Sequence, residues 1–177
     1  ITLLKSISSG SPSFYRAYDL LASAYKKSGY TKEAIQTYNQ MKKLVPANAL
    51  EINLSIVKLY LANDQTDKAE ALLNELLIQY PEYEAIHEYL CTIYMEQKDF
   101  GPAERELQVL IDADPDNYSY YFMYSRLAEM TGNTRKAREY SLLGNQSLQA
   151  MLDKNPENIP LAFERAAQYQ KDKDIVS

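Results

Sequence analysis

The chain has 177 residues, of which 46% are apolar and 24% are charged, and its formal net charge is -5. This composition is close to that of average globular proteins, so it excludes a disordered chain and a coiled coil. The acidic balance also argues against a nucleic-acid surface, because phosphate binding rests on clustered Lys and Arg. No apolar run approaches the ~18 residues of a membrane span, so we expect no membrane insertion in this segment.

In chain order, the apolar spacing and the turn residues predict a series of short helices joined in pairs. The predicted helices span residues 13–27, 31–44, 50–62, 66–79, 83–97, 100–112 and 117–130, then a helix from 134 and a last one over 159–173. Gly29 closes the first of these helices, and prolines separate one pair from the next. Proline can stop a helix because it lacks the N–H that would continue the hydrogen-bond ladder.

Three kinds of landmark recur at intervals of 34 or 35 residues: a mostly aromatic position, an alanine and a proline. They stand at Tyr25, Tyr60, Tyr94 and Ala128, at Ala34, Ala69, Ala103 and Ala137, and at Pro12, Pro46, Pro81 and Pro115. A period in this range indicates stacked supersecondary units, each of which cannot bury its apolar stripe alone. Because three independent landmarks keep it, the period is stronger evidence than any single motif.

The period divides the chain into repeats and two flanking pieces. Residues 1–12 are predicted to be the tail of a preceding repeat's second helix, residues 13–48, 49–82, 83–116 and 117–156 to be four full repeats, and residues 157–177 to be a terminal or capping helix, or the start of a fifth unit. The apolar stripe at Ile1, Leu3, Leu4 and Ile7 is the reason for the first assignment, and it leads us to expect that the segment begins inside a repeat.

The fourth repeat is longer than the others. Pro115 and Pro156 are 41 residues apart, which is seven more than the period, and we expect these seven residues to extend the second helix of this repeat. Seven residues are almost two helical turns, so the buried stripe stays nearly in phase. Leu148, Met151 and Leu152 continue that stripe. The extra turns are expected to pack on the last helix or, alternatively, to form a lip over one end of a groove.

The first repeat carries Leu21-Ala22-x-x-Tyr25, the turn at Gly29, Ala34-x-x-x-Tyr38 and Pro46 in fixed order. This order resembles the tetratricopeptide repeat family, whose pattern places leucine, a small residue and tyrosine on a first helix, alanine and an aromatic residue on a second, and proline afterwards. The resemblance covers roughly the whole chain. It implies an all-α, right-handed superhelical solenoid of antiparallel helix pairs, in which each unit touches only its neighbours and the first helices line a concave face.

Candidate sites for chemistry are weak. Asp112, Asp114 and Asp116 have the alternate spacing of a calcium loop, but Asn117 stands where glycine is required and Met123 where the closing glutamate is required. We therefore interpret these aspartates as part of a turn between repeats, and we expect no metal.

The only histidine, His87, and the only cysteine, Cys91, lie one turn apart on a single predicted helix. His87 has Glu84 and Glu88 nearby but no second strong ligand, and Cys91 occupies a small-residue slot where it should be buried and inert. No nucleophile elbow, phosphate-binding glycine loop or zinc-protease motif is present. We therefore expect no enzyme, no catalytic residue and no cofactor.

The family resemblance implies that the candidate site is a groove along the concave face. By helical phase, the side chains opposite the packing stripe of the first helices should point into it. The predicted partner-binding residues are Leu54, Lys58, Leu61, Tyr89, Thr92, Met95, Phe122, Arg126 and Met130. The best-known peptide-binding members of the family hold a C-terminal carboxylate with a clamp of Lys and Asn side chains. The corresponding places in this chain carry Asp19, Ser23 and Ser55, so that clamp is absent.

These observations predict a non-enzymatic scaffold or adaptor that binds a peptide or helix of another protein in its concave groove. Two alternatives stay open. One is a substrate-docking or regulatory arm of a larger enzyme whose catalytic domain lies outside this segment. The other is a self-assembling structural solenoid, and thus a homo-oligomer, in which one end inserts into the next copy.

Overall fold

The structure is a computed structural model, and it describes residues 15–176. Its helices are α2 (Tyr15–Lys27), α3 (Thr31–Leu44), α4 (Ala49–Leu61), α5 (Thr66–Gln79), α6 (Glu84–Gln97), α7 (Phe100–Ala113), α8 (Tyr118–Met130), α9 (Thr134–Lys154) and α10 (Ile159–Val176), with a 3-10 turn η2 (Pro46–Asn48). No strand occurs within the described range. The predicted all-α class of antiparallel helix pairs is therefore confirmed, whereas the helix predicted within residues 1–12 lies outside the described residues.

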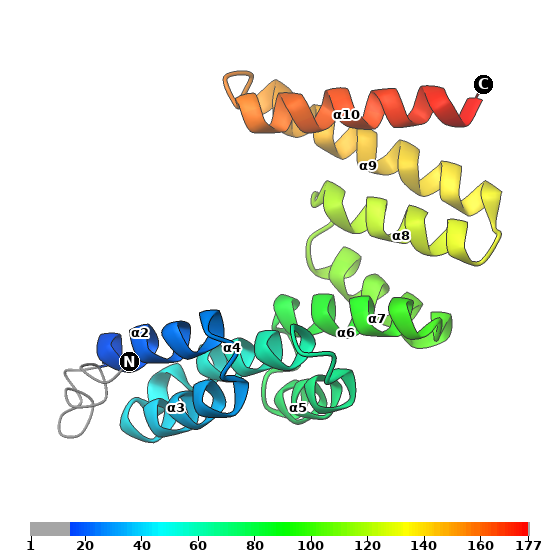
Figure 1. The fold of residues 1–177 in the computed structure, drawn as a ribbon. Coiled ribbons are helices and arrows are strands. Elements are labelled where there is room, and N and C mark those ends of the chain that lie inside the picture. The colour runs from blue at the N-terminus through cyan, green and yellow to red at the C-terminus, as the bar shows by residue number, and fades with distance from the viewer. Residues whose placement is uncertain (1–14, 177) are drawn as a thin grey trace. The chain divides into compact units, whose positions relative to one another are not determined.

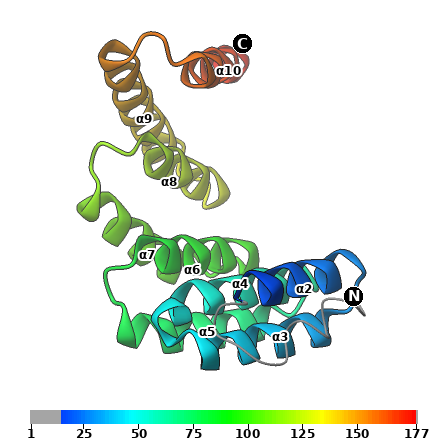
Figure 2. The ribbon, with the colours of Figure 1, turned by 90° about the vertical axis from the view of Figure 1, so that its left-hand side faces the viewer.

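The chain divides after Pro81 into two compact units. In the first unit, α2 pairs with α3 and α4 pairs with α5, while α3 also contacts α4. In the second unit, α6 pairs with α7 and α8 pairs with α9, α7 contacts α8, and α10 lies against α9 (Figure 1 and Figure 2). Within each unit, the helices thus pack on their neighbours in sequence, as stacked hairpins require. The exact limits of the repeats stay a prediction from the period.

The turns inside the four hairpins share one backbone geometry. Each contains one residue with a left-handed backbone, and these are Gly29, Asp64, Lys98 and Gly132. The next residue in each turn donates its backbone N–H to the carbonyl of the landmark position, in the pairs Tyr30 to Tyr25, Gln65 to Tyr60, Asp99 to Tyr94 and Asn133 to Ala128. This is the six-to-one bond of a Schellman ending, which needs a positive φ at the residue between. Glycine meets that need without strain in the first and fourth hairpins only.

The small-residue slots lie where the two helices of each hairpin approach most closely. The slots on the first helices hold Ala22, Val57, Cys91 and Ser125, those on the second helices hold Ala34, Ala69, Ala103 and Ala137, and all eight side chains are buried. Larger apolar side chains surround them. Leu21, Tyr25 and Tyr38 belong to the core of the first unit, and Leu107 and Tyr124 belong to the core of the second. The pattern that carried the family resemblance is therefore a packing pattern.

The helix starts differ in detail from the sequence prediction. Asn117 and Asn133 cap α8 and α9, since their side-chain oxygens accept the backbone N–H of Ser119 and Lys136 respectively. Thr31 and Thr134 have the residue type of a cap but do not act as one, because both are the first residues of their helices. Thr31 instead donates its hydroxyl to Asn63 Oδ1 at 2.6 Å, which ties the turn of one hairpin to the start of a helix in the other.

Helix α9 has 21 residues and α7 has 14, so the predicted extension of seven residues is present. Leu148 is fully buried, but Met151 is 39% exposed and does not continue the stripe as predicted. Arg165 of α10 donates to Asn145 of α9 at 2.9 Å. On the outer side of α10, Ile159 and Phe163 are 66% and 72% exposed. The repeat pattern predicts Ala166 and Tyr169 in the repeated slots of this helix, but their side chains lie outside the described ones. That this helix is a cap stays a prediction.

Candidate interaction surface

The first helix of each hairpin buries one side against its partner helix and leaves another side open. In the first unit, Lys58 on α4 is exposed and Leu61 is half-buried. In the second unit, Thr92 on α6 and Arg126 and Met130 on α8 are exposed, and Tyr89 is half-buried. These six members of the predicted groove set are available to a ligand to different degrees, and they combine two cations with apolar and aromatic groups.

Two members of the predicted set are not available. Leu54 is only 8% exposed and Met95 only 6% exposed. Met95 belongs to the core of the second unit together with Cys91, whose thiol lies 3.8 Å from the Met95 sulfur. Helical phase predicted both residues to face outward, but both side chains are buried. We therefore do not keep them among the proposed contact residues.

Phe122 is only half-buried, but its ring is committed to packing. Gly144 on α9 faces this ring so closely that a β-carbon added there would lie 2.7 Å from Cε1 of Phe122. Tyr118 contacts the same ring edge-to-face, with 6.0 Å between the centroids. The ring therefore fills a place that the missing side chain of Gly144 leaves open, and Phe122 is mainly a structural residue.

Acidic side chains follow the open side of α6. Glu84, Glu88 and Glu96 are exposed and share this side with Thr92, at a spacing of four residues. Helix α6 contains no Lys or Arg. Residues four apart on a helix are neighbours, so these like charges repel one another. We call this set (Glu84, Glu88, Thr92 and Glu96) the acidic strip. The sequence itself carries this signal, since the three glutamates are separated by four and eight residues within one predicted helix.

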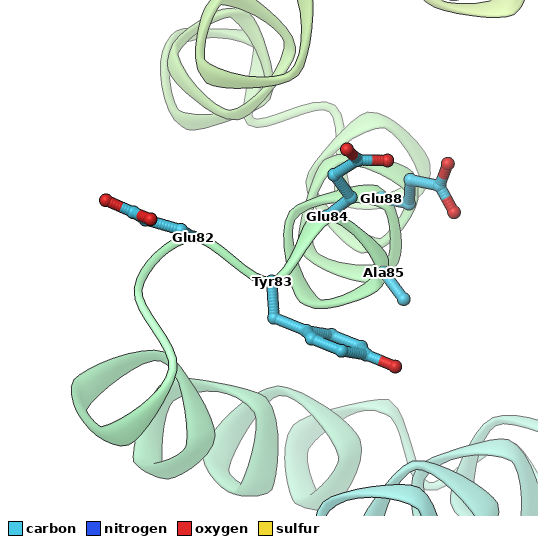
Figure 3. A pocket seen from close by; sticks show the side chains of 5 residues that line it. All are labelled: Glu82, Tyr83, Glu84, Ala85 and Glu88. Atoms are coloured by element: carbon cyan, nitrogen blue, oxygen red, sulfur yellow. The ribbon is translucent and has the colours of Figure 1, made fainter. Parts of the chain in front are cut away.

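A hollow of about 360 Å³ lies at the start of the acidic strip, lined by Glu82, Tyr83, Glu84, Ala85 and Glu88. Figure 3 shows the carboxylates of Glu84 and Glu88 on the same side of α6, with Tyr83 and Ala85 on the adjoining side. The hydroxyl of Tyr120 on α8 lies 3.1 Å from a carboxylate oxygen of Glu84 and 3.2 Å from one of Glu88. Burial, followed by the charge of Glu88, raises the pKa of Tyr120, so this hydroxyl keeps its proton.

The remaining candidates for chemistry are structural. His87 is buried, and its Nδ1 lies 2.6 Å from a carboxylate oxygen of Glu106 on α7 rather than beside Glu84 or Glu88. Burial, and then the charge of Glu106, raises the pKa of the Cys91 thiol to about 12. A thiol in that state is a poor nucleophile at neutral pH.

The aspartates whose spacing resembles a calcium loop also have a structural role. The carboxylate of Asp114 accepts the backbone N–H of Asp116, and Asn117 caps the next helix. These bonds form the turn between α7 and α8. Within residues 15–176, no group of three acidic, histidine or cysteine side chains is placed to hold a metal ion. In the same range, no helix is both long and apolar enough to cross a membrane.

Family comparisons agree with the hairpin geometry. A tetratricopeptide repeat model matches residues 15–48, which include α2 and α3, and a second model of this family matches residues 60–127. The chain belongs to the tetratricopeptide repeat family. Repeats of this family serve generally as non-catalytic protein-interaction modules. No curated protein matches the chain significantly.

Solved structures similar to this tetratricopeptide repeat protein include MamA from Desulfovibrio magneticus RS-1, with a TM-score of 0.63 and 15% identity over 77% of this chain and 76% of that one. A tetratricopeptide repeat protein from Parabacteroides merdae has a TM-score of 0.63 and 19% identity over 94% of this chain and 63% of that one. BtubC from P. vanneervenii has a TM-score of 0.63 and 17% identity over 81% and 67%. At these identities the likeness establishes the fold alone.

Proposed function

We propose that the chain is a protein-interaction scaffold that binds a peptide or a helix of a partner protein along the open side of its first helices. The observation that supports this proposal is the mixed character of that side. Arg126 and Met130 are exposed one turn apart on α8, and the half-buried ring of Tyr89 lies on α6. A cation beside an apolar group suits a polypeptide, since one group can meet an acidic residue of the partner and the other an apolar residue.

The surface is a better candidate for a polypeptide than for a small substrate. The open sides of the first helices carry isolated polar groups, and the hollow at the start of α6 is lined mainly by carboxylates, whereas small-molecule sites are usually lined by apolar side chains with a few convergent polar groups. Helical-repeat proteins use such extended faces for binding because each repeat adds one helix to the surface. Of the predicted contact residues, we retain Lys58, Leu61, Tyr89, Thr92, Arg126 and Met130.

The test compares two double variants of the whole chain. Arg126→Ala with Met130→Ala removes an exposed cation and an exposed apolar group four residues apart on the first helix α8. Arg138→Ala with Leu142→Ala removes the same two kinds of group at the same spacing on the second helix α9. We expect the α8 variant to lose proteins that the wild-type chain captures, and the α9 variant to retain them. Both should keep the wild-type thermal midpoint.

The captured proteins are identified by mass spectrometry and their affinity is then measured with purified components. A loss of about tenfold or more in the α8 variant alone supports the proposal, because one exposed charge-assisted contact and one apolar contact together account for roughly that factor. Equal affinity of both variants for every identified partner would contradict binding on this side.

A further inference from the structure

No ion pair among the described residues neutralises the acidic strip. Among the described residues the ion pairs are His87 with Glu106, Lys136 with Glu104, and Lys154 with Asp116. None of them includes a residue of the strip. Exposed Glu84 and Glu88 are also joined by Glu82, which lies on the same hollow. The negative charge at the start of α6 is therefore concentrated and open to a cation from outside.

The Tyr120 hydroxyl holds two of these carboxylates in place without cancelling their charge. Tyr120 is only 1% exposed, so its ring fixes the position of the hydroxyl. That hydroxyl has one hydrogen and lies within 3.2 Å of both Glu84 and Glu88. It can donate to only one of the two at a time. The second carboxylate keeps its acceptor capacity, and both keep their charge.

The geometry suits a planar cation with several donors. Both carboxylates lie within hydrogen-bond distance of one oxygen atom, so a guanidinium group placed over them can donate to each. The adjacent hollow of about 360 Å³ is large enough to hold a long side chain. Glu96 continues the negative charge along the helix and can meet further cations of an extended partner.

We propose that α6 binds a basic segment of the partner protein, with one Arg or Lys side chain received by Glu84 and Glu88. This inference rests on the proposed function, because it names the chemistry of the polypeptide that lies along the first helices. Charge complementarity is its basis, since the strip is negative along its length and carries no basic group. A metal ion is the weaker occupant, because no group of three ligands is placed for one among the described residues.

The probe is a fluorescein-labelled, alanine-rich peptide with two arginines four residues apart, and its counterpart has glutamine at both places. Binding to the whole chain is measured by fluorescence anisotropy. Glu84→Gln with Glu88→Gln removes both charges but keeps acceptors for the Tyr120 hydroxyl. Glu139→Gln with Glu157→Gln changes the net charge equally at two exposed sites elsewhere in the second unit, and serves as the matched control.

We expect the α6 variant to bind the arginine peptide at least about tenfold more weakly than the wild type, as for the loss of one charge-assisted contact. The control should change the affinity less than about twofold. Thr92→Lys is a second variant that leaves the Tyr120 contacts intact. A lysine four residues after Glu88 supports the helix and competes for the same charge, so it should reduce binding without lowering the thermal midpoint.

Equal weakening in the α6 variant and in its control would overturn the inference, because it would reduce the effect to the overall negative charge. Wild-type binding of the glutamine peptide as tightly as the arginine peptide would also overturn it. Failure of the proposed function is a separate result, in which the α8 variant and its α9 control bind every identified partner equally. If the α8 variant loses a partner that the α6 variant and Thr92→Lys retain, the scaffold function stands and only the basic chemistry of the partner is wrong.

Discussion

The third and fourth hairpins of the chain carry exchanged side chains at two equivalent repeat positions. In the hairpin of α6 and α7, the first helix carries Glu88 and the second carries Leu110, which is fully buried. In the hairpin of α8 and α9, the residues 34 positions later are Phe122 and Gly144. Leucine fills the core from the second helix in one hairpin. In the other, phenylalanine fills the corresponding place from the first helix, over a glycine.

This exchange separates two roles of one repeat position. Glu88 is exposed, and Leu110, which stands at the repeat position of Gly144, is buried in the core. The position of Phe122 is not free, because Gly144 provides no side chain and the aromatic ring must take its place. Interiors are packed to nearly constant density, so the size of one residue determines the role of its neighbour. A repeat position therefore does not have one function throughout the chain.

The largest expected effect comes from making the third hairpin resemble the fourth. Leu110→Gly should destabilise the protein by about 3 kcal/mol or more, because it combines a large cavity with a glycine inside a helix. Adding Glu88→Phe should recover part of this loss if the two positions complement each other as Phe122 and Gly144 do. Urea denaturation of the single and double variants measures both quantities. A double variant that is less stable than Leu110→Gly alone would argue against the exchange.

The next largest effect concerns Gly144, where the stability change caused by one substitution should change sign between two backgrounds. In the wild type, Gly144→Ala should destabilise by about 1 kcal/mol, because its β-carbon would lie 2.7 Å from the Phe122 ring. In a Phe122→Ala background, the same substitution should stabilise by up to about 1 kcal/mol, since alanine is the better helix former. A double-mutant cycle from denaturant titrations gives the coupling.

Gly101 on α7 provides the matched control. Apart from its chain neighbours, a β-carbon there meets only Arg105, at 3.9 Å, and the backbone has no positive φ. Gly101→Ala should therefore have the same effect on stability in both backgrounds, including any strain against the following Pro102. If Gly144→Ala also had the same effect in both backgrounds, the close approach of the Phe122 ring would not contribute to stability.

The sequence was sufficient for the fold because the alanine landmarks are core residues. Ala34, Ala69 and Ala103 are fully buried, and their spacing directly reflects hairpin packing. The sequence was less informative about the surface. Helical phase placed Met95 and Phe122 outward, but phase describes one helix, whereas exposure depends on the neighbouring helix. The Phe122 contact depends on a glycine 22 residues away, and no periodic pattern signals a missing side chain.

A smaller effect on stability tests the contact that joins the third hairpin to the fourth. Tyr124 of α8 donates its hydroxyl to Glu104 of α7, and Lys136 of α9 lies 2.9 Å from the same carboxylate. The Tyr124 hydrogen bond, followed by that of Lys136, lowers the pKa of Glu104 from its ordinary value of 4.5. Because the pKa is lowered in the folded state, the stabilisation is complete above 4.5 and is lost as the pH falls through the folded-state value.

Glu104→Gln should therefore lower the free energy of unfolding at neutral pH. The loss should be no more than about 1 kcal/mol, because solvent screens a carboxylate that is 46% exposed. The difference in unfolding free energy between the variant and the wild type should become smaller as the pH falls below 4.5. Urea titrations at neutral and at acid pH measure this change, with Glu139→Gln as a variant at an exposed carboxylate. A difference that is the same at both pH values would exclude an ionic contribution from this contact.

The smallest effect concerns the slot that holds Cys91 in the third hairpin and Ser125 in the fourth. Ser125 donates its hydroxyl to the carbonyl of Ala137 at 2.8 Å, whereas Cys91 contacts only the sulfur of Met95 among the hydrogen bonds described.

Because burial and the charge of Glu106 raise the pKa of Cys91 to about 12, its thiolate fraction at neutral pH is roughly a thousandfold below that of an ordinary thiol. We expect iodoacetamide to label the native protein very slowly and the urea-unfolded protein fast, as followed by mass spectrometry. An Arg138→Cys variant that also carries Cys91→Ser offers an exposed thiol for comparison, and labelling of native Cys91 at a similar rate would mean that the third hairpin opens far more readily than its core packing implies.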